Sequence, residues 1–65
     1  MRTTVITKPH TLKRDIECDT LKIECKGVTI SGKITANRVI APYGVTMTHP
    51  DNKIGSFIGI LNMTL

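Results

Sequence analysis

The chain has 65 residues, a formal net charge of +4 and 40% hydrophobic side chains, with one Tyr, one Phe and no Trp. This length excludes more than one domain, so residues 1–65 are expected to form a single small β domain that buries only about 60% of its unfolded surface. Two cysteines are too few for a secreted disulfide framework. A partner subunit is therefore the expected source of additional stability.

The beginning of the chain is basic. Four cations lie before or directly beside the first acid, Asp15: Arg2, Lys8, Lys13 and Arg14. A strand is predicted over residues 3–7, ended by the turn Lys8-Pro9-His10, and residues 1–13 are a candidate mobile arm. This segment has no continuous apolar run of the signal-peptide type, which favours a cytoplasmic protein with reduced thiols.

Period-two alternation dominates the middle of the chain. Leu21 and Ile23 alternate with Lys22 and Glu24, a pattern typical of a half-buried strand. Strands are predicted over 16–25, 28–31, 33–36, 38–41, 44–48 and 56–65. Turns are predicted at Lys26-Gly27, at Pro42-Tyr43-Gly44 and at His49-Pro50-Asp51-Asn52, where Pro and Gly supply the required φ angles.

The middle of the chain also repeats itself. Gly27-Val28-Thr29-Ile30 returns 17 positions later as Gly44-Val45-Thr46-Met47. Ile16, Cys18 and Leu21 return 18 positions later as Ile34, Ala36 and Val39, and the next step reaches Phe57. Periods near 20 residues are typical of stacked structural repeats.

Two all-β architectures fit this repeat. In a β-solenoid of about three to four short rungs, equivalent residues stack, so that Ile16 lies over Ile34, Cys18 over Ala36, Val28 over Val45 and Ile30 over Met47. In the alternative, each unit is an antiparallel hairpin of a small sheet or barrel, with Gly27 and Gly44 in bulged loops. The solenoid accounts for the register as well as for the turns, and is favoured.

The segment Ser31-Gly32-Lys33-Ile34-Thr35-Ala36-Asn37-Arg38-Val39-Ile40-Ala41 resembles the G-x-I-x-A-x-x-V-x repeat of bactofilins, and the resemblance extends over residues 16–47. It implies a right-handed parallel β-helix and a polymer-forming function. Bactofilins have more rungs than this chain can form. The breaks at Lys8-Pro9-His10 and His49-Pro50-Asp51-Asn52 have no counterpart in their pattern.

The sequence offers no constellation for catalysis, so a non-enzymatic protein without cofactors is expected. Cys18 and Cys25 are too far apart for the C-x₂₋₄-C spacing of zinc sites, and His10 and His49 lie far apart in the chain, so no metal is expected. No serine has a histidine next to it in the sequence as a candidate base. No window is long enough for a transmembrane segment.

The charges permit an anionic partner without requiring one. Candidate anion contacts, at which a nucleic-acid backbone would bind, are Arg2, Lys8, Lys13, Arg14, Lys33 and Arg38. Only Tyr43 and Phe57 offer aromatic platforms for single-stranded nucleic acid. Lysines that keep exposed strands soluble explain the same pattern and are the favoured reading.

The last part of the chain is its most apolar stretch. Twelve uncharged residues follow Lys53, more than one face of a small monomer can bury. The predicted protein interface consists of Ile54, Phe57, Ile58, Ile60, Leu61 and Leu65. The leading hypothesis is a self-assembly or protein-interaction module that acts through sheet edges and apolar end faces. The alternatives are a small basic nucleic-acid-binding protein and a short virus-type inhibitor that docks on a host protein.

Overall fold

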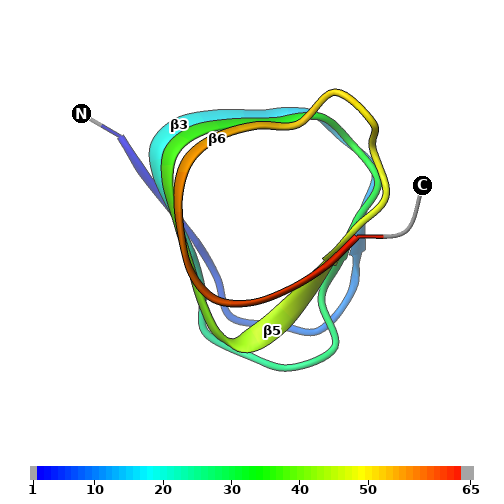
Figure 1. Cartoon of the computed structure of the whole chain (residues 1–65). Helices are drawn as coiled ribbons and strands as arrows, with labels where there is room; N and C mark the ends of the chain where they lie inside the picture. The colour runs from blue at the N-terminus through cyan, green and yellow to red at the C-terminus, as the bar shows by residue number, and fades with distance from the viewer. Residues whose placement is uncertain (1, 64–65) are drawn as a thin grey trace.

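The computed structural model describes residues 2–63, which form six β-strands and no helix. The chain winds as a coil of about three turns with a roughly triangular outline, and successive turns superpose in the view of Figure 1. The strands are β1 (Thr3–Ile6), β2 (Thr11–Leu12), β3 (Ile16–Ile23), β4 (Thr29–Ile30), β5 (Ile34–Met47) and β6 (Lys53–Met63). This is the predicted β-solenoid.

All strand pairs are parallel, which excludes the antiparallel hairpin alternative among the described residues. Ile16 pairs with Ile34 and Cys18 with Ala36, 18 positions apart, and Ile30 pairs with Met47 at a displacement of 17. The predicted repeat is therefore the register of the coil. One turn of backbone corresponds to one copy of the repeat.

Inward-facing side chains stack in ladders and form one apolar core. Leu21 pairs with Val39, and Val39 pairs in turn with Phe57, so three successive turns place an apolar side chain at the same position. The buried core consists of Ile6, Ile16, Leu21, Ile23, Val28, Ile30, Ile34, Ala36, Val39, Ala41, Val45 and Met47. No polar side chain in the described part of the chain is fully buried. The free energy that holds the coil together thus comes mainly from apolar burial between turns.

The strand boundaries differ from the prediction where the chain bends without leaving the sheet. The three strands predicted between residues 33 and 48 are one bent strand, β5, which continues through Pro42. Proline is tolerated there because the register shifts between Ala41 and Val45, so no ladder hydrogen bond is required of Pro42. The last strand begins at Lys53 rather than at residue 56.

The first turn of the coil is incomplete. β1 pairs with residues Thr20–Ile23 of β3, and β2 pairs with β4, so residues 3–6 and 11–12 of the candidate arm take part in the sheet. The β2 strand was not among the predicted strands, because Thr11-Leu12 is too short to show alternation. Residues Ile16 to Cys18 of β3 consequently have no β1 residue beside them.

Side chains at the corners of the coil satisfy backbone groups of the neighbouring turn. The Lys33 amide donates to Asp15 Oδ1 at 2.8 Å, and the Ile34 amide donates to Asn52 Oδ1 at 2.9 Å. The Ser31 hydroxyl donates to the Leu12 carbonyl oxygen at 3.2 Å. Corners interrupt the strand ladder, and these side chains take its place as hydrogen-bond partners.

Candidate protein-interaction site

The C-terminal turn of the coil is the predicted interface, and the structure divides its residues into two groups. Ile54, Phe57 and Leu61 are partly buried and pack against the core. Ile58 and Ile60 are 55% and 58% exposed. Leu65, the sixth predicted residue, lies outside the described residues. The first group closes the end of the core, whereas the second faces away from it.

The C-terminal turn is open on one side. β6 pairs with β5 along its length and has no second neighbour among the described strands. Met63, paired with the fully buried Met47, is itself 50% exposed, because no other described strand lies on its free side. Lys53 is the one charged residue of this eleven-residue strand. We call β6 and its uncovered apolar side chains the C-terminal end.

Sequence reasoning did not identify Tyr43 and Ile40 as neighbours of this surface. Ile40 pairs with Ile58. Gly44 lies against Ile60, because a Cβ added to Gly44 would be 3.8 Å from the Ile60 Cβ. Tyr43, beside Gly44, is 56% exposed. A displacement of 18 positions takes residue 58 back to residue 40 and would have found Ile40, whereas Tyr43 lies within the register shift between Ala41 and Val45. The exposed apolar surface therefore continues from β6 onto the outer side of β5.

The predicted anion contacts occupy two separate places. Arg2, Lys8, Lys13 and Arg14 belong to the incomplete first turn and the corner after it, whereas Lys33 and Arg38 belong to the third turn. Arg38 pairs with Thr20, and Lys22 pairs with Ile40. The cations therefore form no continuous row along the coil. Arg2, Lys8 and Arg14 line adjoining recesses at the N-terminal end.

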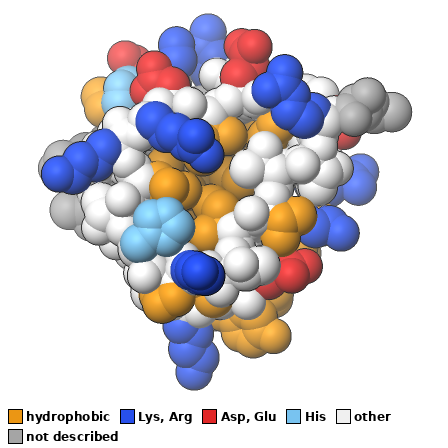
Figure 2. Space-filling model, turned by 180° about the vertical axis from the view of Figure 1, so that it is seen from behind, with side chains coloured by type: hydrophobic (Ala, Val, Ile, Leu, Met, Phe, Trp, Pro, Cys, Tyr) orange, Lys and Arg blue, Asp and Glu red, His pale blue; other side chains and the backbone are white. Residues whose placement is uncertain are grey.

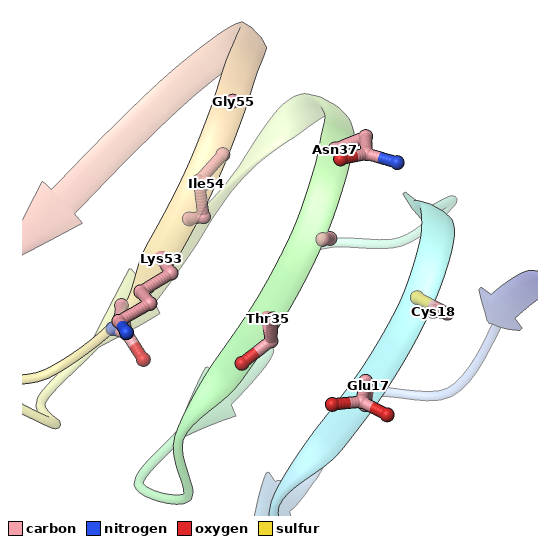
Figure 3. Close-up of a pocket in the computed structure, with 9 residues that line it drawn as sticks. Glu17, Cys18, Thr35, Asn37, Lys53, Ile54 and Gly55 are labelled. Atoms are coloured by element: carbon pink, nitrogen blue, oxygen red, sulfur yellow. The ribbon is translucent and has the colours of Figure 1, made fainter.

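A shallow open depression of about 580 Å³ lies across the first segments of β3, β5 and β6. Figure 3 shows Glu17, Thr35 and Lys53 in a row over the three neighbouring strands, with Cys18 and Ile54 close by. The Cys18 thiol donates to the Thr20 carbonyl oxygen at 3.4 Å, so its hydrogen bond goes to the backbone of its own strand.

Neither a metal site nor a membrane-spanning helix occurs in the part of the chain that the structure describes. Residues 2–63 contain no cluster of three His, Cys, Asp or Glu side chains that would hold a metal ion. Cys18 and Cys25 are both free thiols. Among the same residues, no helix reaches the length and hydrophobicity that a membrane crossing requires.

One carboxylate has a clearly shifted pKa, and its partner lies on the next turn. Asn37 Nδ2 donates to Asp19 Oδ1 at 2.8 Å. This hydrogen bond lowers the pKa of Asp19 below its ordinary value, and the Thr20 hydroxyl contributes in the same direction against partial desolvation. The charged carboxylate thus links the second turn to the third.

We expect the replacement Asn37→Ala to raise the pKa of Asp19 toward its ordinary value. A folded-state pKa below the unfolded value stabilises the protein above about pH 4 and loses this contribution as the pH falls through the folded pKa. The variant should therefore lose less of its free energy of unfolding than the parent does when the pH falls below about 4. A carbon-detected NMR titration of the Asp19 carboxyl group measures the shift directly. An unchanged, low pKa in Asn37→Ala would show that the amide is not its cause.

No protein-family model, curated protein or solved structure matches the chain. The features of the chain that bear on its function are the two ends of the coil and its sides.

Proposed function

We propose that the protein is a non-enzymatic self-association module whose C-terminal end is covered by the C-terminal end of a second copy. The observation that carries this proposal is the unprotected edge of β6. Edge strands of soluble proteins are usually short, charged, bulged away or covered, because a free row of N–H and C=O groups pairs with other chains. β6 has eleven residues and a single charge, at Lys53.

Apolar burial supports the same conclusion. Phe57 and Leu61 pack on the core from one side only, and Ile58, Ile60 and Met63 are at least half exposed. A chain of this length has a small margin of stability on its own, and covering these side chains adds about 25 cal/mol for each Å² of apolar surface removed from water. A partner on this end thus supplies stability that the isolated chain lacks.

Charge favours a pair of C-terminal ends over other arrangements. Two N-terminal ends would place Arg2, Lys8, Lys13 and Arg14 against the same four cations of the other copy, which is unfavourable. A C-terminal end placed on an N-terminal end would bring Lys53 to the same cations. Two C-terminal ends bring together surfaces with one charge each, and a two-fold dimer closes the assembly.

The replacement Phe57→Asp tests this interface. A carboxylate in place of the phenyl ring would be desolvated in the dimer without a partner, so the variant is expected to run as a monomer at concentrations where the parent is a dimer. Sedimentation velocity measures both masses. The control is Val5→Asp, which adds the same charge at a 49% exposed residue of the first turn and should leave the parent's mass unchanged.

Two outcomes would contradict the proposed interface. The first is a soluble, folded Phe57→Asp chain with the parent's dimer mass. The second is a Val5→Asp chain that dissociates as readily as Phe57→Asp. Circular dichroism of both variants separates loss of assembly from loss of the fold.

The gathered cations at the N-terminal end are the observation in favour of the second candidate, a small nucleic-acid-binding protein. A salt titration distinguishes the two functions. Binding to a phosphate backbone weakens steeply between about 50 and 200 mM salt, because it releases counterions. Apolar self-association holds or strengthens over the same range.

A short inhibitor that docks on a host protein would use the same uncovered β6 edge, and it would do so as a monomer in the absence of its target.

A further inference from the structure

The N-terminal end of the coil has an apolar centre inside a charged rim in which cations are frequent. β6 lies nearest the viewer in Figure 1, so the reversed view in Figure 2 looks onto the opposite end, where hydrophobic side chains gather at the centre and Lys, Arg and His side chains surround them, with Asp and Glu side chains farther out at the edge. A recess of about 200 Å³ lies at this end, lined by Thr4, Val5, Ile6, Thr7, Lys8, His10, Leu12, Arg14 and Ile16. Ile6 and Ile16 are core residues, so the recess opens onto the end of the core.

The backbone at this end has unpaired edges. β1 pairs only with β3 and β2 only with β4 among the described strands, so each has one free side. Residues Ile16 to Cys18 are free on the same side, because β1 pairs with β3 from Thr20 onward. A free edge of this kind accepts an extended peptide as an added strand, with main-chain hydrogen bonds for affinity and side-chain recesses for specificity.

The recess itself is lined by cations and by no acid. Asp15 Oδ1 accepts the Lys33 amide and Asp19 Oδ1 accepts the Asn37 side-chain amide, both from the third turn. Asp15 and Glu17 also line an adjoining depression with Arg2 and Arg14, where they offset part of the charge of those two side chains. Lys8 and Arg14 are the charged residues in the lining of the recess, so an incoming segment meets positive charge there.

We propose that this end binds an extended, acidic segment of a partner protein, added as a strand along β1, beside the recess that Leu12 of β2 also lines. Every second side chain of the segment would be apolar and would cover the recess beside Ile6 and Leu12. The alternate side chains would be acidic and would meet the cations of the rim. A second copy does not fit this description, because its C-terminal end carries Lys53 and no acid on β6.

This proposal concerns the end of the coil opposite to the self-association surface, and neither depends on the other. A dimer joined through two C-terminal ends would present two such binding sites at its outer ends. A monomer would present one.

The test uses fluorescein-labelled (Val-Asp)₄ as the probe and fluorescence anisotropy as the readout. The parent chain should bind this peptide, and the double variant Lys8→Glu/Arg14→Glu should bind it at least ~10-fold more weakly. The control variant Lys33→Glu/Arg38→Glu has the same net charge but changes the third turn, so its affinity should match the parent's. Circular dichroism confirms that both variants are folded.

Three further probes decide the chemistry of the ligand. (Val-Lys)₄ should not bind, and (Val-Asp)₄ with N-methylated valines should bind at least ~10-fold more weakly, because it cannot complete the strand ladder. Equal binding of the N-methylated peptide, or equal loss in the control variant, would overturn the proposal. The proposal would also be overturned if oligo-deoxythymidine or phosphatidylserine vesicles bound more tightly than (Val-Asp)₄ and this binding were lost in Lys8→Glu/Arg14→Glu.

Discussion

The replacement Gly32→Ala is expected to remove much or all of the free energy of unfolding of the chain. A Cβ on Gly32 would lie 2.0 Å from the Arg14 carbonyl oxygen and 2.9 Å from the Asp15 amide nitrogen. Both are backbone atoms of the preceding turn, and relief of the clash requires the turns to separate. The expected cost exceeds about 4 kcal/mol, against a total stability of about 3–10 kcal/mol for a chain of this length.

The matched control is Gly44→Ala. Gly44 has a φ of +95°, so an alanine there is strained, but its Cβ would meet only ordinary contacts at 3.8 Å or more. The expected cost is about 1–3 kcal/mol, which leaves a folded protein. Urea unfolding followed by circular dichroism compares the two variants with the parent. A Gly32→Ala chain that unfolds at the parent's urea midpoint would contradict the close approach of the turns.

The replacement Ile34→Ala is expected to lower the free energy of unfolding by about 2–5 kcal/mol. Ile34 is fully buried in the third turn and stacks on Ile16 of the second. Removal of its outer carbon atoms leaves a cavity between two turns, which the rigid backbone ladder cannot close. The cost is then the lost transfer free energy together with the cavity.

The same chemical change on the outer surface gives the control. Ile58→Ala removes the same atoms from a side chain that is 55% exposed, and its expected effect on the monomer is within about 0.5 kcal/mol. Urea unfolding at two protein concentrations tenfold apart separates monomer stability from any contribution of assembly. Equal destabilisation by the two variants would contradict the assignment of inward and outward faces.

The register of the coil could be predicted because stacked turns repeat their side-chain requirements. Each inward position faces the same core, so Ile16 and Ile34 are alike, and so are Ile30 and Met47 in size and polarity. The two displacements found in the sequence both occur in the structure: β3 pairs with β5 at 18 positions, and β4 pairs with β5 at 17. Periodicity of this kind is visible in a single sequence.

The hydrogen bonds at the corners could not be predicted. Asp15 and Asn52 look like ordinary turn residues, yet each accepts a backbone amide from the neighbouring turn. Such pairs join residues 18 positions apart, and their geometry depends on how the corner bends. Local propensity holds no information about that bend.

The apolar stretch of the C-terminal turn could be predicted from the sequence, but the surface that it forms could not. The twelve uncharged residues after Lys53 indicate excess apolar area. Strict alternation counted from Phe57 places Ile58 and Ile60 on one face and Leu61 on the other, as the structure has them. The same alternation places Ile54 on the face of Ile58, whereas Ile54 packs against the core. The change of face between Ile54 and Phe57 is therefore the part that alternation along the sequence does not give.

The mass of the parent chain in solution, measured by light scattering over a hundredfold range of concentration, tests the central claim most directly. Covering of the β6 edge by a second copy predicts twice the chain mass at the upper concentrations, with dissociation on dilution. The mass of a single chain at every concentration would contradict the proposed self-association.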